Sequence, residues 1–189
     1  MNTPEAAATA LAAGQVVGIP TETVYGLAVD PYAAGALRRL SALKWRDPEK
    51  PIALLGVDLE ALEPFGEFTP LARELARAHW PGPLTMVLAT RGTPVDGLGD
   101  PQRRTVGLRI PDHPVALALL ARTGPLAVTS ANLSGHAEAL DDTAARAMFG
   151  DAVSVWLPGT STGGAGSTVV DLTTTPPTIL RPGPITLSF

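Results

Sequence analysis

Cysteine is absent from all 189 residues of this sequence. Its absence excludes disulfide bonds, thiol catalysis and zinc sites with cysteine ligands. Histidine occurs only three times, at His79, His113 and His136, and these positions do not have the spacing of a shared metal site. The sequence therefore predicts no metal ion held by the protein alone.

Long hydrophobic runs are also absent. No segment reaches the roughly 18 consecutive apolar residues that a membrane-spanning helix needs. The alanine-rich segment at residues 1–14 has no basic stretch in front of its apolar residues, whereas a signal peptide begins with one. These two features predict a soluble, cytoplasmic protein without a membrane partner.

Basic residues are in the minority, with 14 lysines and arginines against 18 acidic residues, a net charge of −4 and a pI of about 5.3. Such a charge argues against a protein that coats nucleic acid by bulk electrostatics. Lysine occurs only at Lys44 and Lys50, with Arg46 between them. These clustered cations could bind an anion in a local pocket, or they could form a solvated turn after a helix.

The order of apolar segments predicts an α/β layer architecture. The length and the 45% hydrophobic content are enough for a substantial core in one domain. Short runs rich in Val and Ile alternate with segments rich in Ala and Leu, which is typical of strands alternating with helices. Strands are expected at residues 15–20, 23–30, 52–55, 84–90, 105–111, 125–131, 152–158 and 167–173. Helices are expected at residues 3–14, 33–43, 69–79, 114–122 and 142–149.

The helix boundaries carry capping signals. Thr3 and Thr69 each precede a proline, the order that favours an N-cap followed by the first helical residue. Pro48 prevents the helix at residues 33–43 from continuing. Lys44 and Arg46 are therefore expected at, or just beyond, the C-terminal end of that helix.

Two loops have compositions that suit ligand binding. GTSTGGAGST at residues 159–168 could present backbone N–H groups and hydroxyls to a phosphate or carboxylate. It lacks the Gly-Lys-Ser/Thr ending of a P-loop, and a flexible surface loop is the alternative interpretation. TSANLSG at residues 129–135 could hold a polar ligand, but the same residues also form ordinary turns. No Gly-x-Ser-x-Gly motif surrounds Ser130, so a serine hydrolase is not indicated.

Two further segments leave alternatives open. PTETVYG at residues 20–26 lies between expected strands, so it could line a crevice or form a tight hairpin with Tyr25 in the core. Arg109 lies within an apolar strand, where a buried guanidinium requires an anionic partner. That partner could be a ligand or an internal Asp or Glu.

In order along the chain, several segments together resemble the YrdC-like family of L-threonylcarbamoyladenylate synthases. The segments are PTETVYGLAVD, KWR, KP, WPGPLT, VGLRIPDHP, TSANLSG, GSTVVD and LRPGPI. The KxR and SxN signatures of the family correspond to Lys44-Trp45-Arg46 and Ser130-Ala131-Asn132. The resemblance implies one YrdC-like domain over residues 1–189, in the single-domain form. It also implies a twisted, mostly open mixed sheet with flanking helices around a positively lined cavity.

The resemblance implies a nucleotidyltransferase that converts L-threonine, bicarbonate and ATP, with Mg²⁺, to threonylcarbamoyl-AMP and pyrophosphate. The threonine amine and bicarbonate form a carbamate, which attacks the α-phosphate. Because the substrate supplies the nucleophile, the protein only has to position the anions and neutralise charge. The product would pass to downstream transferase proteins that modify tRNA to threonylcarbamoyladenosine.

The resemblance also implies roles for individual residues. Lys44 and Arg46 are the expected catalytic residues. The residues expected to bind ATP are Lys44, Arg46, Lys50, Ser130, Asn132 and Arg181. The residues expected to bind threonine are Thr23, Tyr25, Arg109 and Ser167.

Two alternatives of other kinds remain at this point. One is a module that binds double-stranded RNA and acts in ribosome maturation, although the acidic pI and the lack of an aromatic stacking motif count against it. The other is a paralogue that carbamoylates a different acceptor.

Overall fold

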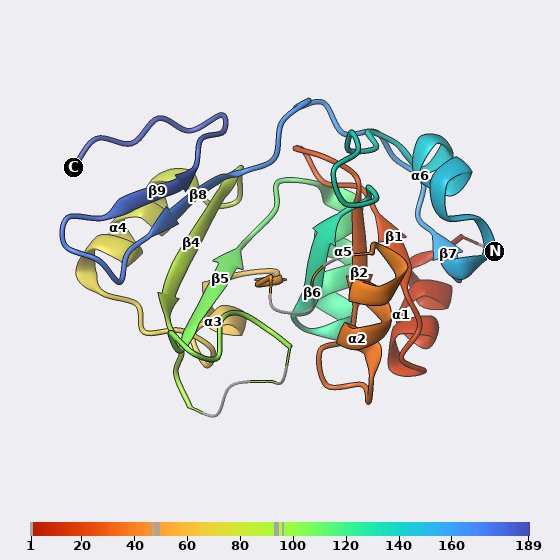
Figure 1. The fold of residues 1–189 in the computed structure, drawn as a ribbon, viewed down its shortest axis with the longest axis horizontal. Helices are drawn as coiled ribbons and strands as arrows, with labels where there is room; N and C mark the ends of the chain where they lie inside the picture. Colours follow the sequence, from red (N-terminus) through yellow and green to blue (C-terminus); the bar gives the residue numbers. More distant parts are fainter. Residues whose placement is uncertain (1, 46, 48–49, 93–94, 96) are drawn as a thin grey trace.

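The computed structural model describes residues 2–45, 47, 50–92, 95 and 97–189 (Figure 1). Its helices are α1 (Pro4–Ala12), α2 (Ala36–Leu43), α3 (Leu59–Leu62), α4 (Pro70–His79), α5 (Pro114–Thr123) and α6 (Asp142–Phe149), with a 3-10 turn η1 (Gly150–Ala152). Its strands are β1 (Val17–Ile19), β2 (Gly26–Val29), β3 (Ala53–Leu55), β4 (Leu84–Ala89), β5 (Thr105–Arg109), β6 (Leu126–Ser130), β7 (Val155–Trp156), β8 (Thr168–Asp171) and β9 (Thr178–Arg181).

The strands form one open, mixed sheet in the order β7-β1-β2-β6-β3-β5-β4-β8-β9. The pairs β1–β7, β3–β5 and β4–β8 are parallel. The other neighbouring pairs are antiparallel. The predicted α/β class with an open mixed sheet is therefore confirmed.

Local signals set two helix starts as predicted. The Thr3 hydroxyl accepts a hydrogen bond from the Ala6 backbone N–H at 3.3 Å, and the Thr69 hydroxyl accepts one from Ala72 at 3.2 Å. Both threonines are N-caps followed by proline at the start of the helix. These caps satisfy backbone N–H groups that have no partner inside the helix.

The sequence did not predict α3 or β9. Helix α3 is a single turn capped by the Asp58 carboxylate, which accepts from the Ala61 N–H at 2.8 Å, and one turn is too short for a helical apolar pattern. All four residues of β9 are exposed, and its sequence TILR does not alternate between apolar and polar side chains. The strand forms because its backbone pairs with the edge of β8.

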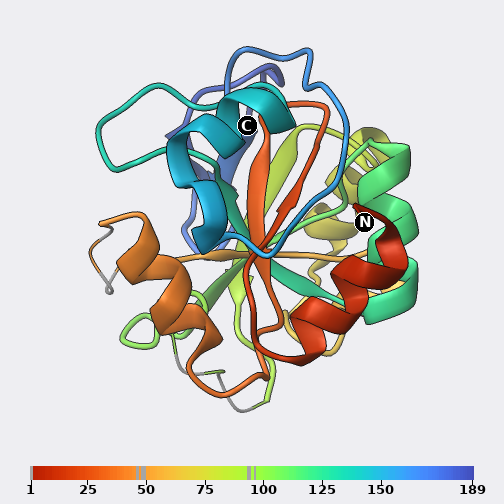
Figure 2. The same ribbon diagram turned by 90° about the vertical axis from the view of Figure 1, so that its right-hand side faces the viewer.

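Helices cover the two faces of the sheet unequally. Helices α1 and α5 pack on one face, where they share a core cluster with β1, β2 and β6. Helices α2, α4 and α6 contribute to a larger cluster on the other face. Viewed along the sheet, α1 and α5 lie together on one side of the strands, and α2 and α6 lie on the opposite side (Figure 2).

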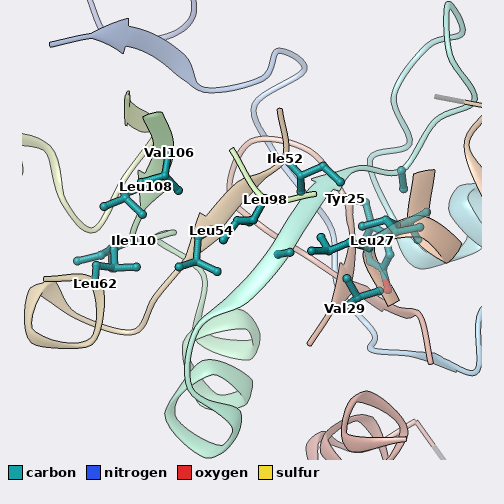
Figure 3. Packing of buried hydrophobic residues seen from close by; sticks show 14 of the residues in the cluster. Tyr25, Leu27, Val29, Ile52, Leu54, Leu62, Leu98, Val106, Leu108 and Ile110 are labelled. Carbon is teal, nitrogen blue, oxygen red and sulfur yellow. The ribbon is translucent and has the colours of Figure 1, made fainter. Parts of the chain in front are cut away.

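Alternate residues of the central strands β2, β6 and β3 enter different clusters, as the two-residue period of a strand requires. Leu27 of β2 and Ala127 of β6 belong to the larger cluster, whereas Ala28 and Val128 belong to the smaller one. Figure 3 shows part of the larger cluster, where buried leucines of β2, β3 and β5 lie among their neighbours.

Within the described residues, no helix is both long enough and apolar enough to cross a membrane.

Candidate active site

A cavity of about 280 Å³ lies on the face of the sheet that α1 and α5 cover, beyond the reach of these helices. Val128 and Leu55, which belong to the cluster under α1 and α5, also line this cavity. The described residues that line it come from strands and loops. Its volume is close to the lower end of ligand sites, which enclose about 300–1,000 Å³.

The polar wall of the cavity follows from alternation along β5. Thr105, Gly107 and Arg109 line the cavity, while Val106 and Leu108 between them belong to the core on the opposite face. Gly107 has no side chain to fill the cavity floor, where a Cβ would contact the Thr85 methyl group at 3.4 Å. One strand therefore supplies a hydroxyl, an open floor and a guanidinium.

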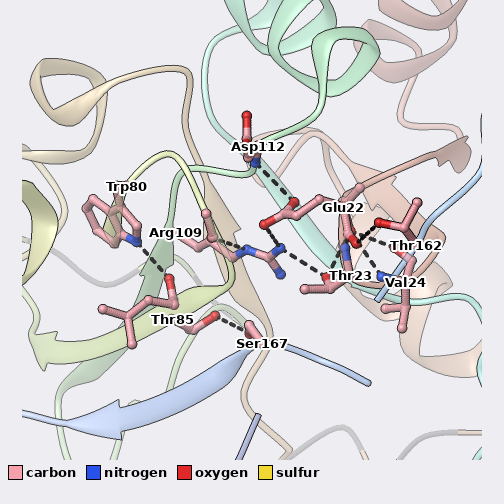
Figure 4. Close-up of polar contacts among 12 residues, drawn as sticks. Glu22, Thr23, Val24, Trp80, Thr85, Arg109, Asp112, Thr162 and Ser167 are labelled. Atoms are coloured by element: carbon pink, nitrogen blue, oxygen red, sulfur yellow. Dashed lines mark hydrogen bonds and ion pairs between the residues drawn. The ribbon is translucent and has the colours of Figure 1, made fainter. Parts of the chain in front are cut away.

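Arg109 forms the centre of a buried polar network (Figure 4). Its Nη2 donates to Glu22 Oε1 at 2.7 Å and to the Thr23 hydroxyl at 3.0 Å. Its Nε donates to the Gly82 carbonyl at 3.2 Å. Burial lowers the pKa of the Arg109 guanidinium and Glu22 raises it, and an arginine remains charged in either case. The partner left open by the sequence is therefore an internal glutamate.

Glu22 also connects two segments that are distant in the sequence. Its Oε2 accepts from the Asp112 backbone N–H at 3.0 Å, in addition to the ion pair of Oε1 with Arg109. The turn at residues 80–83 also joins this network through the Gly82 carbonyl. A Cβ at Gly82 would lie 2.4 Å from the His79 carbonyl oxygen. Glycine at this position thus lets the turn present its carbonyl to Arg109.

A second polar group surrounds Ser167. Its hydroxyl lies 2.7 Å from the Thr85 hydroxyl and accepts from Arg181 Nη2 at 3.1 Å. The Arg181 Nε donates to the Ser167 carbonyl at 3.0 Å. A Cβ at Gly166 would lie 2.9 Å from the Arg181 guanidinium carbon, so glycine gives this side chain its place. The end of the glycine-rich segment thus positions a serine and an arginine at the cavity.

The structure brings the two signature motifs together. Lys44 is only 2% exposed, and its Nζ donates to the Ser130 carbonyl and, at 3.0 Å, to Asn132 Oδ1. The Ser130 hydroxyl donates to the same Asn132 oxygen at 2.7 Å. Of this group only Ser130 lines the cavity, and Lys44 and Asn132 lie behind it as its hydrogen-bond partners. The solvated-turn interpretation is wrong for Lys44.

Other predicted site residues lie elsewhere. Tyr25 is fully buried against Trp156, and its hydroxyl donates to the Leu157 carbonyl at 2.6 Å. Tyr25 therefore lies in the core, as the hairpin interpretation predicts. Thr21, Thr23, Val24 and Gly26 of the same segment line the cavity, so its interpretation as a crevice segment is also confirmed. Lys50 is exposed and is not among the residues that line the cavity. Arg46 lies outside the described residues, so its predicted role stays a prediction.

The described cavity lining has more cationic than anionic side chains. The described lining includes Arg103, Arg109 and Arg181, and two carboxylates, Asp100 and Glu138. The described lining thus carries one excess positive charge, and Arg103 and Arg109 are also ion-paired with Asp171 and Glu22, so the predicted positive lining stays a prediction. Charges in a partly enclosed site interact more strongly than on an open surface.

The comparison of this chain with family models identifies its family. The model for Sua5/YciO/YrdC domains, described as telomere recombination, matches residues 9–183. The chain belongs to the Sua5/YciO/YrdC family. The threonylcarbamoyl-AMP synthase of Thiobacillus denitrificans is 42% identical over 164 residues, which cover 85% of this chain and 86% of the relative.

Solved structures of the Sua5/YciO/YrdC family have the same fold. The crystal structure of P. abyssi Sua5 complexed with L-threonine is 35% identical, with a TM-score of 0.87 over 95% of this chain. The present chain spans about half of that protein, 54% of its length. E. coli YciO is 26% identical, with a TM-score of 0.88 over 96% of this chain and 89% of its own.

Several residues at or beside the cavity were not predicted. Thr85 and Thr105 line it from β4 and β5, Arg103 lines it from the loop before β5, and Glu22 lies behind it as the partner of Arg109. The alternation of residues along β5 was a usable signal for Thr105, whereas Thr85 is the only polar residue of β4. Glu22 and Arg103 had no local signal, since their partners are far away in the sequence.

Proposed function

We propose that this protein is a threonylcarbamoyl-AMP synthase, which forms threonylcarbamoyl-AMP and pyrophosphate from L-threonine, bicarbonate and ATP. The observation that carries the proposal is the meeting of two polar groups at one cavity. Ser130, which is bonded to Lys44 and Asn132, lines one wall, and Arg109 and Ser167 with their networks line another. The names of the relatives support the same reaction.

The threonine end of the cavity would be the wall built by Arg109, Thr23, Thr85 and Ser167. Arg109 is held by Glu22 and would face the substrate carboxylate with a fixed orientation. The hydroxyls of Thr85 and Ser167 already form a pair and can each exchange hydrogen-bond partners with the substrate hydroxyl. The complex of P. abyssi Sua5 with L-threonine supports threonine as the amino acid.

The nucleotide would lie toward Ser130, with Lys44 and Asn132 behind it. Arg181, which is bonded to Ser167, would reach the phosphates from the threonine end. Lysine and arginine are the side chains that bind phosphate oxygens, arginine through two parallel donors and lysine as a point charge. Lys44 is held at the end of α2 by oxygens of residues 130 and 132, so its charge is positioned before a substrate arrives. Such preorganised charge is the main source of transition-state stabilisation in phosphoryl chemistry.

The reaction balances without a protein nucleophile. The threonine amine adds to bicarbonate and loses water to give a carbamate. A carbamate oxygen then forms a bond to the α-phosphorus of ATP, while the bond from that phosphorus to the oxygen bridging to the β-phosphate breaks and pyrophosphate leaves. The residues of this chain would hold the two anions in line and neutralise the charge that develops on the leaving group.

Mg²⁺ would enter with ATP and neutralise phosphate charge. Within the described residues, no group of three or more His, Cys, Asp or Glu side chains is placed to hold a metal ion. The cavity carboxylates Asp100 and Glu138 are oxygen ligands of the type that Mg²⁺ prefers. They would complete the coordination of an ion held mainly by phosphate oxygens.

The product is a mixed anhydride, which hydrolyses unless another protein uses it. We expect downstream transferases of tRNA modification to receive it in the cytoplasm. Purified protein incubated with ATP, Mg²⁺, bicarbonate and L-threonine should yield threonylcarbamoyl-AMP by mass spectrometry, with an equal amount of pyrophosphate. Formation of a carbamoyl adduct only with another acceptor would favour the paralogue, and no adenylate at all would reject the synthase.

A further inference from the structure

Arg103 lines the cavity from the loop between β4 and β5, outside the segments that carry the resemblance to the family. Its Nη2 donates to Asp171 Oδ2 at 2.6 Å. Asp171 is the last residue of β8 and is only 1% exposed, whereas the side chain of Arg103 is 49% exposed. The ion pair therefore joins a buried anchor to a cation at the cavity.

The anchor is fixed on its other side as well. Asp171 Oδ1 accepts from the Thr173 backbone N–H at 2.9 Å and from the Thr173 hydroxyl at 2.6 Å. Burial alone raises the pKa of Asp171, but the hydrogen bonds from Thr173 and Arg103 lower it overall. Asp171 is therefore an ionised carboxylate with both oxygens engaged.

The backbone that carries Arg103 is held too. Asp100 Oδ1 accepts from the backbone N–H groups of Gln102 and Arg103, both at 3.0 Å. The backbones of Asp100 and Thr105 exchange two hydrogen bonds, of 2.8 and 3.0 Å. Both the backbone and the guanidinium of Arg103 are thus held in place. Binding an anion would therefore cost little additional side-chain conformational entropy.

Arg103 differs from the other arginines of the cavity in where its donors point. Arg109 directs Nε and Nη2 to Gly82, Glu22 and Thr23, and Arg181 directs Nε and Nη2 to Ser167. For Arg103, the side-chain contact within the described structure is made by Nη2 alone. A guanidinium has five N–H donors in one plane, so several of them remain for a ligand.

The position of Arg103 favours phosphate over the amino-acid carboxylate. Thr105 and Arg109 lie at opposite ends of the cavity face of β5, and a strand rises about 3.4 Å per residue, so these ends are about 14 Å apart. One carboxylate assigned to Arg109 cannot also reach the end near Thr105 and Arg103. A nucleotide with its chain of phosphates is long enough to extend to the end of the cavity near Thr105 and Arg103.

We propose that Arg103 is a further phosphate-binding residue, which contacts the polyphosphate of the nucleotide, and that Asp171 is its positioning residue. The identity of the nucleotide rests on the proposed function. Planar, bidentate donors are suited to phosphate oxygens, and a carboxylate behind the guanidinium fixes its plane.

Pyrophosphate binding measured by calorimetry tests this role without requiring turnover. We expect Arg103→Ala and Arg103→Gln to weaken pyrophosphate binding by about tenfold, the loss typical of one charge-assisted contact. The control is Arg104→Ala, because this neighbouring arginine is exposed and does not line the cavity; its affinity should stay within about twofold of wild type. Arg103→Gln keeps a hydrogen-bond donor for Asp171 if Arg103→Ala does not fold.

Unchanged affinity in the folded Arg103 variants, an equal loss in Arg104→Ala, or no binding of pyrophosphate or ATP by the wild type would each overturn the proposal. If the wild type binds pyrophosphate but forms no threonylcarbamoyl-AMP, the proposed function fails while the phosphate-binding role stands.

Asp171→Asn tests the positioning role. It should weaken pyrophosphate binding several-fold, and adding it to Arg103→Ala should cause little further loss, because the two residues act through one contact. With substrates, the KM for ATP should rise more than kcat falls. Additive losses in the double variant, or an unchanged KM, would show that Asp171 only supports the fold.

Discussion

At the scale of single residues, Lys44 both holds the loop at residues 130–132 and is expected to neutralise phosphate charge. It is buried at the end of α2 and bonds the oxygens of residues 130 and 132. Lys44→Ala should lower pyrophosphate release by about a hundredfold, the scale of losing one electrostatic contact to a developing charge. A coupled pyrophosphate assay would measure this loss.

A matched control separates chemistry from folding in this variant. Arg38→Ala removes a cation from the exposed side of the same helix and should leave the rate within about twofold, since Arg38 is exposed, whereas Lys44 is buried against the cavity residue Ser130. Near-wild-type turnover in a folded Lys44→Ala protein would contradict the assignment. Thermal denaturation of both variants reports whether α2 and the loop at residues 130–132 remain intact.

The hydroxyl groups at the threonine end predict the order of substrates. Serine lacks one methyl group of threonine, which costs about 1–3 kcal/mol, whereas valine leaves buried hydroxyl partners such as Thr85 and Ser167 unpaired, which costs more. Relative kcat/KM values should therefore fall from threonine to serine to valine. Equal values for the three amino acids would favour the paralogue with another acceptor.

At the scale of elements, the start of α5 depends on a titratable cap. His113 is the N-cap, and its Nδ1 accepts from the Val115 backbone N–H at 3.3 Å. Burial lowers the pKa of His113 from its ordinary value of 6.5, although the charges of Glu22 and Asp112 oppose this. The folded state therefore favours neutral His113, so its contribution to stability is present above pH 6.5 and is lost as the pH falls below that value.

His113→Asn should remove this pH dependence, because asparagine caps a helix at any pH. Between pH 8 and pH 5.5, the free energy of unfolding of the wild type should fall by up to about 1 kcal/mol more than that of the variant. This difference is the typical contribution of one N-cap. Urea denaturation at both pH values measures the difference. His136→Asn, at an exposed position, is the control. Parallel pH profiles for the wild type and His113→Asn would rule out the cap as the titrating element.

At the scale of the whole molecule, the positive charge is local. The chain has 18 acidic against 14 basic residues, while the cavity gathers Arg103, Arg109 and Arg181. Such a distribution suits the phosphates of one nucleotide better than a long backbone, whose binding weakens by roughly 0.9 log unit per phosphate contact for each tenfold rise in salt on duplex DNA.

The protein should therefore form the adenylate at its full rate without tRNA, and it should bind duplex RNA only weakly at about 150 mM salt. Titration of labelled duplex RNA beside an RNA-free pyrophosphate assay measures both properties. Submicromolar RNA binding together with no pyrophosphate release would reject the proposed synthase function and favour the RNA-binding module.

The sequence by itself determined what depends on close neighbours. The caps at Thr3 and Thr69 bond N–H groups three residues away, so the helix starts could be predicted. The strand segments other than β9 followed from their apolar runs. The contact between Ser130 and Asn132 is likewise local, since the two residues of this motif bond one another.

Only the tertiary structure decided what depends on the register and twist of the sheet. Arg109 could have been paired by a ligand, but the fold places Glu22, 87 residues away, against it. Likewise Arg103 reaches Asp171 across 68 residues, and the hydroxyl of Tyr25 finds a carbonyl 132 residues away, in the core. Contacts of this range form only when distant strands have paired, so no local pattern in the sequence specifies them.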